Sequence, residues 1–185
     1  MPQIIRAPDE ILTERLRLRP VRPSDAALVE LYASDARVAR MTERIPHPYP
    51  PGLAESFVDR MTSGTPGEIC WAIEVQAEPG STAEANALIG TIILRFGSEG
   101  SARVGYWVAP AFWNTGYASE AVEAVVAHAP CLGLREITAR VFQDNAASVR
   151  VLIHAGFAYV DDGEAYSLGR GGVVATHNYR LEIPS

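Results

Sequence analysis

Residues 104–121 read Val-Gly-Tyr-Trp-Val-Ala-Pro-Ala-Phe-Trp-Asn-Thr-Gly-Tyr-Ala-Ser-Glu-Ala, and the rest of the chain can be arranged around them. The first part is apolar and aromatic, as in a strand, and Pro110, Asn114 and Gly116 are typical of a turn. From Ala118 onward, apolar residues recur at the spacing of one helical face. The stretch therefore predicts a strand, a loop and the start of a helix.

The start of this predicted helix is suited to an anion. Backbone N–H groups in a first helical turn lack intrahelical partners, and the aligned peptide dipoles give them partial positive charge. Gly116 has no Cβ, and Ala118 and Ser119 are small, so a phosphate can approach the backbone closely. An ordinary strand-to-helix turn explains a single glycine loop equally well.

The composition indicates one globular domain, residues 1–185, with residues 1–12 as a loose arm. The formal net charge of -6 disfavours a nucleic-acid partner, because such proteins present a basic face. Cys70 and Cys131 are far apart and lack metal-ligand spacing, so we expect free thiols and no metal. The chain shows neither a signal peptide nor an apolar run of about 20 residues, which predicts a cytoplasmic protein without a membrane partner.

The remaining elements alternate between strands and helices. Strands are predicted at residues 15–19, 69–75, 87–96, 102–108, 135–142, 158–161 and 173–183, with a polar hairpin at 78–86 and a glycine turn at 169–172. Besides the helix that follows Gly116, helices are predicted from Asp25 to about Ser34, at 53–62, and from Asn145 to Gly156. This order predicts an α/β (α+β) fold with a mixed, mostly antiparallel sheet.

Two polar features of the N-terminal part have more than one interpretation. Arg15, Arg17 and Arg19 share one face of the first predicted strand, for which a solvated face is favoured over a patch for an acidic partner. His47 and Tyr49 lie in a proline-rich loop at residues 45–51, which proline keeps out of helices and central strands. They either line a binding site or belong to a plain connection between helices.

Two separated motifs resemble the GNAT superfamily of N-acetyltransferases. Residues 105–108 and 113–121 resemble its acyl-CoA signature, and residues 144–157 resemble its second cofactor motif. Ser148, Leu152 and the opening residues 13–25 are similar to the branch that contains the ribosomal-protein N-terminal acetyltransferases (Rim-type). The resemblance spans residues 13–181 and implies a single GNAT-like domain, with a twisted sheet flanked by helices and a splayed central strand.

The resemblance implies acetyl-CoA as co-substrate, with its pyrophosphate on residues 114–118 and its pantetheine along residues 106–108. A backbone N–H at Val108 would polarise the thioester carbonyl, and the Ser148 hydroxyl would serve the departing thiolate. Asn145 would bind the pantetheine, although a helix cap for Asn145 and a surface hydroxyl for Ser148 are the alternatives. The implied cofactor-binding residues are Tyr106, Trp107, Val108, Trp113, Asn114, Thr115, Gly116, Tyr117, Ala118, Ser119, Asn145 and Ser148.

Three positions depart from the family pattern. Trp113 replaces an Arg or Gln at the loop, Arg103 replaces a Glu that serves as base in many relatives, and Leu152 replaces a Tyr that often serves as acid. The general base is therefore open. We expect water to act as the base, and Glu74 and His177 are the other candidates. For Glu74 a solvent-facing position on its strand is favoured over catalysis, and for His177 a structural role is favoured.

The leading hypothesis is direct acetyl transfer from acetyl-CoA to a primary amine, which is either a small molecule or a protein N-terminus. A homodimer is one of the possible oligomeric states. The alternative is a non-catalytic acyl-CoA-binding or sensing module, suggested by Arg103 and Leu152. A nucleotide phosphotransferase is disfavoured, because no Gly-Lys-Ser/Thr follows the loop.

Overall fold

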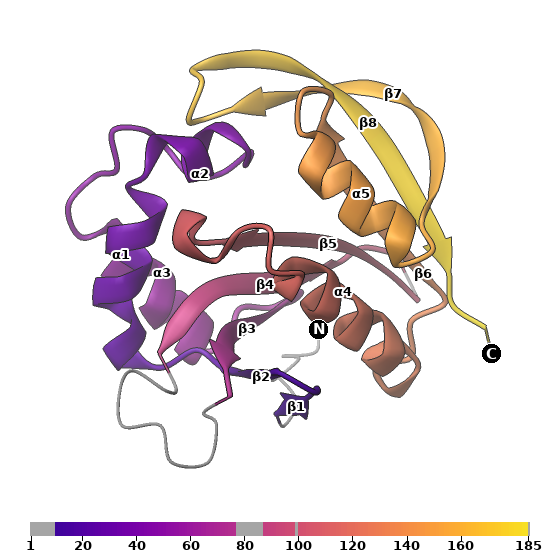
Figure 1. The fold of residues 1–185 in the computed structure, drawn as a ribbon, viewed down its shortest axis with the longest axis horizontal. Coiled ribbons are helices and arrows are strands. Elements are labelled where there is room, and N and C mark those ends of the chain that lie inside the picture. Colours follow the sequence, from indigo (N-terminus) through magenta and orange to yellow (C-terminus); the bar gives the residue numbers. More distant parts are fainter. Residues whose placement is uncertain (1–9, 77–86, 99, 185) are drawn as a thin grey trace.

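The computed structural model describes residues 10–76, 87–98 and 100–184. Within these residues eight strands form one sheet in the order β1-β2-β3-β4-β5-β6-β8-β7 (Figure 1). Neighbouring strands are antiparallel, except for the parallel pair β5 and β6. The strands are β1 (Ile11–Leu12), β2 (Leu16–Pro20), β3 (Glu68–Val75), β4 (Leu88–Phe96), β5 (Ser101–Val108), β6 (Glu136–Phe142), β7 (Ala158–Ser167) and β8 (Gly172–Glu182).

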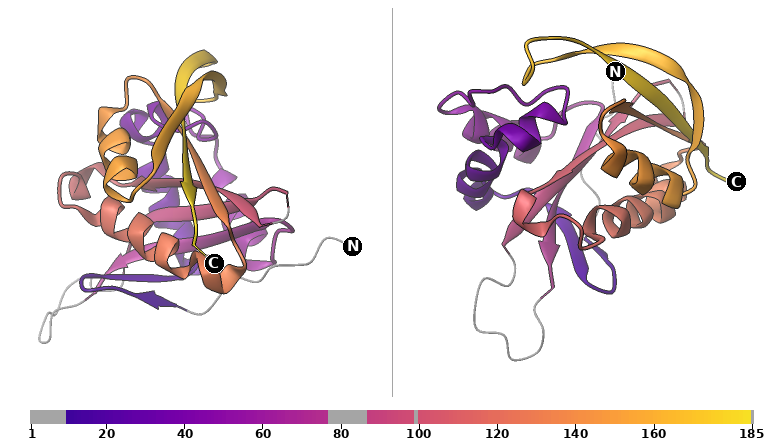
Figure 2. Two further views of the ribbon diagram at one scale, coloured as in Figure 1. Left: turned by 90° about the vertical axis from the view of Figure 1, so that its right-hand side faces the viewer. Right: turned by 45° about the horizontal axis from the view of Figure 1, so that its top comes forward.

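The helices cover both faces of the sheet, α4 and α5 on one and α1 and α3 on the other (Figures 1 and 2). Alternation along β3 explains this layering, because Trp71 packs with α4 while Cys70 and Ala72 pack with α1 and α3. The α-helices are α1 (Ala26–Ala33), α2 (Ala36–Arg40), α3 (Leu53–Thr62), α4 (Tyr117–His128) and α5 (Ala146–His154), and the 3-10 helices are η1 (Pro23–Asp25), η2 (Pro110–Phe112) and η3 (Ala129–Leu132). No described helix has the length and apolar character needed to cross a bilayer.

The central strands β5 and β6 separate halfway along their length. They pair only from Ser101 with Glu136 to Val104 with Ala139, so the second half of β5 has no partner on that side among the described residues. The Ala109 N–H donates to the Ile89 carbonyl at 2.8 Å. Because backbone groups alternate in direction along an antiparallel strand, the N–H groups of Tyr106 and Val108 point away from β4 and into the opening.

A glycine keeps the end of β5 close to β4. A Cβ placed on Gly90 would collide with the Trp107 carbonyl oxygen, so no other residue fits there without moving the backbone of β5. Gly90 therefore helps to hold β5 on β4 at the point where β5 diverges from β6.

Most predicted elements are confirmed, including the mixed, mostly antiparallel sheet, the residues of α3 and the 169–172 turn. Three differ. The short helix α2 was missed, β7 is longer than predicted, and two residues of the predicted N-terminal arm form β1. The predicted hairpin at 78–86 lies outside the described residues.

The hairpin of β7 and β8 arches from the sheet toward α2 (Figure 1). At its tip the Leu168 N–H donates to the Glu43 carbonyl at 3.0 Å, and Arg170 binds both the Arg40 carbonyl and Asp144. These contacts join the C-terminal hairpin to α2, to the segment after it and to the turn before α5.

The expected solvated arginine face is wrong at Arg19, which is only 2% exposed. Its guanidinium binds both oxygens of Asp25 at 2.7 Å and also contacts Glu74. Glu74 is fully buried, so the expectation that it faces solvent is also wrong. The alternation of polar and apolar residues did not predict the burial of Arg19 and Glu74, because it assumes one solvated face whereas both faces of β2 and β3 are covered. A buried cation is tolerated there because carboxylates compensate its charge.

Candidate active site

Two cavities of about 550 and 580 Å³ open on opposite sides of the gap between β5 and β6. We call the first the loop cavity, because the loop before α4 lines it, and the second the arginine cavity, because five arginines line it. Six residues line both cavities: Met41, Thr42, Tyr106, Trp107, Asn145 and Ser148. A molecule in the loop cavity and another in the arginine cavity would therefore meet where the strands separate.

The structure brings the predicted cofactor residues together, with one exception. Thr115 does not line the loop cavity. The predicted residues that line it are Tyr106, Trp107, Val108, Trp113, Asn114, Gly116, Tyr117, Ala118, Ser119, Asn145 and Ser148.

The loop before α4 places the first turn of the helix toward the loop cavity. Asn114 and Gly116 both have positive φ, 59° and 84°, a conformation that glycine adopts without strain. The Glu120 N–H donates to the Gly116 carbonyl at 3.0 Å, so regular helical bonding starts there. The N–H groups of the first turn have no such intrahelical partner, and that of Tyr117 makes only a long contact of 3.5 Å to the Thr115 hydroxyl, so this turn can bind an anion.

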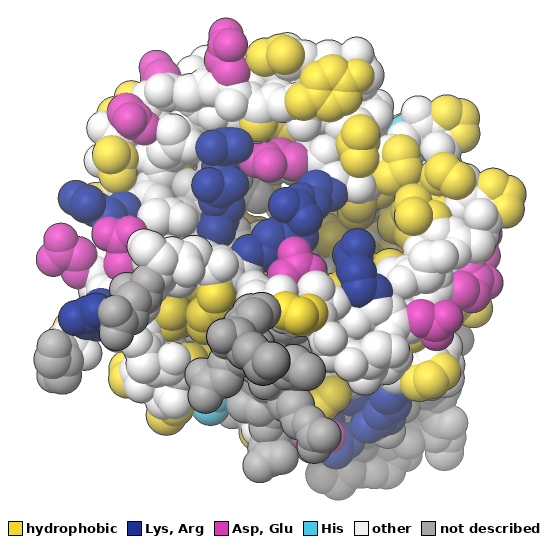
Figure 3. Space-filling model, turned by 180° about the vertical axis from the view of Figure 1, so that it is seen from behind, with side chains coloured by type: hydrophobic (Ala, Val, Ile, Leu, Met, Phe, Trp, Pro, Cys, Tyr) yellow, Lys and Arg dark blue, Asp and Glu magenta, His cyan; other side chains and the backbone are white. Residues whose placement is uncertain are grey.

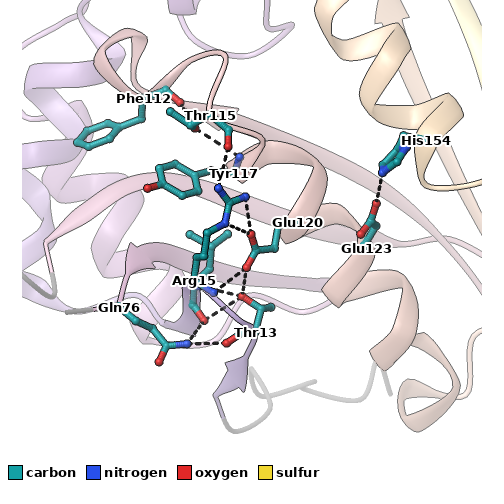
Figure 4. Close-up of polar contacts among 10 residues, drawn as sticks. Thr13, Arg15, Gln76, Phe112, Thr115, Tyr117, Glu120, Glu123 and His154 are labelled. Atoms are coloured by element: carbon teal, nitrogen blue, oxygen red, sulfur yellow. Dashed lines mark hydrogen bonds and ion pairs between the residues drawn. The ribbon is translucent and has the colours of Figure 1, made fainter. Parts of the chain in front are cut away.

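Arg15 holds this loop from the side of β2 (Figure 4). Its guanidinium donates to the Thr115 carbonyl at 2.9 Å and to Glu120 at 2.7 Å, and it lies 4.8 Å from the centre of the Tyr117 ring. Thr115 is thus turned toward Arg15, which explains its absence from the cavity wall. Arg15 is exposed, as expected for a solvated face, but its hydrogen-bond partners lie 100 and 105 residues away in the chain, which the sequence pattern did not indicate.

Glu120 completes this network from the first turn of α4. Burial raises the pKa of its carboxyl group, but the Thr13 hydroxyl and the backbone and guanidinium of Arg15 lower that pKa more. The net effect is a pKa below the ordinary value, so Glu120 is ionised at neutral pH and fixes Arg15.

Trp113 ties the loop to the end of β5. Its indole N–H donates to the Val108 carbonyl at 2.6 Å, and the Arg37 guanidinium lies 5.7 Å from its ring centre. The carbonyl of Val108 is therefore occupied, while its N–H still faces the opening. This gives Trp113 a structural role at the position where the family resemblance leads one to expect Arg or Gln.

Asn145 and Ser148 lie at the start of α5, on the opposite side of the opening. The Ser148 N–H donates to Asn145 Oδ1 at 3.1 Å, so Asn145 is the helix N-cap. Its Nδ2 group has no hydrogen-bond partner within the described part of the chain, although Asn145 lines both cavities. The cap and a ligand contact are therefore compatible, since each uses a different atom of the side-chain amide.

Tyr106 crosses the opening between the strands. Its hydroxyl donates to the Ser148 carbonyl at 3.4 Å, and burial raises its pKa to about 12, so the phenol is neutral at pH 7. Ser148 belongs to the wall that both cavities share.

Neither candidate base on a strand lines a cavity. Glu74 is held by Arg19, and His177 Nδ1 lies 2.7 Å from Asp162 on the neighbouring strand β7. The structural role expected for His177 fits this pairing. Of the proline-loop candidates, Tyr49 lines the arginine cavity and His47 does not.

The thiols lie outside both cavities. Cys70 is buried, which raises its pKa to about 12, and Cys131 is exposed beyond α4. A thiol that stays protonated is a poor nucleophile.

Sequence patterns missed several residues of the site. Met41 and Thr42 follow the short helix α2, and Arg15 reaches the loop only through the pairing of β2 with β3 and the packing of α4. None of these contacts leaves a local signal, because the partners are distant in sequence.

Comparisons with known proteins identify the family and the fold. A family model described as an acetyltransferase (GNAT) domain matches residues 15–158. An uncharacterized N-acetyltransferase, YoaA of Bacillus subtilis (strain 168), is 34% identical over 119 residues, which cover 63% of this chain and 63% of that protein. The match thus spans less than two thirds of that curated relative.

Two solved structures share the fold. An acetyltransferase (GNAT family) from Bacillus anthracis has a TM-score of 0.78 at 23% identity, with 94% of this chain and 98% of that chain covered. RimJ of Mycobacterium smegmatis, in complex with CoA-disulfide, has a TM-score of 0.71 at 21% identity, with 90% and 81% covered. Both likenesses concern the fold of the chain.

Proposed function

Because the chain belongs to the GNAT acetyltransferase family, we propose that it transfers an acetyl group from acetyl-CoA to a primary amine by direct attack. The observation that carries this proposal is the meeting of two cavities where β5 and β6 separate. One cavity offers free helical N–H groups, and the other leads to the same opening from the opposite side. A bound co-substrate and an acceptor amine would then react at the shared wall.

The residues of the loop cavity fit a CoA-type ligand. The first turn of α4 offers N–H groups to a pyrophosphate, and the unpaired N–H groups of β5 and the Nδ2 group of Asn145 suit the amides of a pantetheine. Acetyl-CoA, when bound, supplies an activated acyl thioester.

The chain's own groups would assist the transfer at the opening. We assign the N–H of Val108 to the thioester oxygen, since a preorganised donor stabilises charge that develops during attack. We assign the Ser148 hydroxyl to the departing sulfur, to which it would donate a hydrogen bond or proton. Water remains our choice of base, because Glu74 and His177 lie outside both cavities.

Gly116→Trp tests the place of the co-substrate. A Cβ on Gly116 would lie 3.2 Å from Arg15 Nη2 at a positive φ that side chains rarely adopt, so a Trp there should distort the loop that lines the loop cavity. We expect CoA affinity to fall by at least about tenfold in calorimetry. Gly133→Trp is the matched control, since Gly133 also has positive φ but lies outside both cavities. Equal CoA affinity in the two variants would contradict the assignment.

Ser148→Ala tests the role of the hydroxyl. The cap of α5 uses only the backbone N–H of Ser148, so the helix should be preserved. We expect kcat to fall by about tenfold or more with CoA affinity within about twofold of the wild type. An unchanged kcat would remove Ser148 from the mechanism, and a protein that binds CoA but releases no thiol with any amine would be a sensor.

A further inference from the structure

The arginine cavity is strongly cationic, although the chain as a whole has a formal net charge of -6. The sequence contains no lysine, so the dark blue side chains that gather around the hollow in Figure 3 are arginines. The five arginines that line the arginine cavity come from β4, β5, β6, α3 and the segment after α2: Arg95, Arg103, Arg140, Arg60 and Arg44.

Nearby carboxylates compensate these arginines only in part. Glu68 lies 2.9 Å from Arg95 and 3.6 Å from Arg44, and Glu43 lies 3.7 Å from Arg140. Within the described part of the chain, Arg60 and Arg103 have no carboxylate within 4.0 Å. Five guanidinium groups therefore share two carboxylates, which leaves a cationic surface.

The arrangement is unfavourable for the empty protein. Arg95 and Arg103 are directly opposite in the β4–β5 register, and like charges in that position destabilise a sheet. Burial, followed by repulsion from Arg44, lowers the pKa of Arg95. A group in a cleft whose pKa is perturbed by burial and by a specific neighbouring charge is a candidate for a functional site.

Arg95 also points toward the opening where the cavities meet. A Cβ on Gly105 would lie 3.3 Å from Arg95 Nη1, so the guanidinium extends along β5 over Gly105, next to Tyr106. An anionic group bound there would lie close to the shared wall at which acetyl transfer is proposed.

We propose that the arginine cavity selects a small acceptor amine that also carries a carboxylate or phosphoryl group. Arginine suits both groups, because its planar fork of N–H donors matches their oxygens in pairs. A volume of about 580 Å³ suits a small molecule. This inference rests on the proposed function and adds the charge of the acceptor, which neither the family match nor the fold specifies.

Three amines of equal chain length provide the test: γ-aminobutyrate, aminobutanol and putrescine. Thiol release from acetyl-CoA is measured for each, and kcat/KM is corrected for the fraction of free amine. We expect the carboxylate to exceed the alcohol by at least about tenfold, and the alcohol to exceed the diamine. Aminopropylphosphonate, as a fourth substrate, distinguishes phosphoryl from carboxylate preference. An alcohol or diamine that is as good as both the carboxylate and the phosphonate would overturn the proposal.

Substitutions at Arg103 connect the preference to the cavity. Arg103→Gln should lower kcat/KM for γ-aminobutyrate by about tenfold and leave aminobutanol within about twofold. Arg103→Glu should raise kcat/KM for putrescine relative to that for aminobutanol, because the new carboxylate attracts the second ammonium group. If the new carboxylate acted as a general base instead, kcat/KM would rise for both amines and their ratio would stay the same. Arg180→Gln, outside both cavities, should change neither ratio. Unchanged ratios in both Arg103 variants would refute the assignment.

A binding measurement keeps the charge selection testable if no amine is acetylated. In the presence of CoA, N-acetyl-γ-aminobutyrate should bind at least about tenfold more tightly than N-acetylaminobutanol in calorimetry. Absence of thiol release with this preference intact would refute the acetyl transfer alone. Equal affinities would refute the charge selection, whatever the rates.

Discussion

Arg19 is only 2% exposed and contacts two carboxylates, Asp25 and Glu74, whereas the five arginines of the arginine cavity share two. Arg19 lies between β2, β3 and η1, where its charge is matched by its surroundings. Arg95 and Arg103 face each other across two strands without a carboxylate for each. The same side chain is therefore fully compensated by carboxylates in one region and only partly compensated in the other.

This difference indicates which charges belong to structure and which to ligand binding. A buried cation is tolerated only when carboxylates and hydrogen bonds compensate its desolvation, as at Arg19. Arginines that line a cavity remain in contact with water and can stay uncompensated until a ligand arrives. Substitutions in the two regions should accordingly affect different quantities, stability in one and acceptor choice in the other.

The largest effect should follow from Arg19→Met, which leaves Asp25 and Glu74 buried without their cation. We expect the free energy of unfolding to fall by about 3–5 kcal/mol, measured by equilibrium unfolding in urea. Arg17→Gln on the same strand is the control and should change it by no more than about 1 kcal/mol, since Arg17 is half-buried and pairs with Glu10. Similar losses in both variants would mean that the buried cluster has no special role.

Arg15 stands between these extremes, because it is partly exposed yet bound to Glu120 and to the Thr115 carbonyl. Arg15→Gln should loosen the loop before α4 and weaken CoA binding by about three- to tenfold, or about 1 kcal/mol, in calorimetry. Arg22→Gln, also near β2 but outside both cavities, should leave CoA affinity unchanged. Full CoA affinity in Arg15→Gln would show that the loop keeps its shape without this contact.

Lowering the pH should weaken the same Arg15–Glu120 contact, because the pKa of Glu120 is lowered in the folded protein. A group with a lowered folded pKa stabilises the protein above its ordinary value, here 4.5, and loses this contribution as the pH falls through the folded pKa. The stability difference between wild type and Glu120→Gln should thus be about 1 kcal/mol at pH 7 and should shrink below pH 4.5. A difference that stays constant down to pH 3 would contradict the ionised network.

The sequence was informative where a function depends on neighbouring residues and uninformative where it depends on distant ones. The glycine loop, the α4 start and the Asn145 cap were predictable, because each uses a short local pattern. The partners of Arg15 and Arg19 were not, since they lie on other strands and helices. Alternation even gave the wrong result for Glu74, because it assumes that one face of a strand is exposed.

The smallest effect on stability is expected at Arg103. A small effect is required if Arg103 serves ligand binding and Arg19 serves the fold. Arg103→Gln removes a cation that has no carboxylate partner in the described structure and that opposes Arg95, so the free energy of unfolding should change by less than about 0.5 kcal/mol. If repulsion from Arg95 dominates, the change is a gain that diminishes when salt is raised from low to about 1 M, where screening is strong. A loss comparable to that of Arg19→Met would instead place Arg103 among the structural cations, and the arginine cavity would then be no more than a charged part of the sheet.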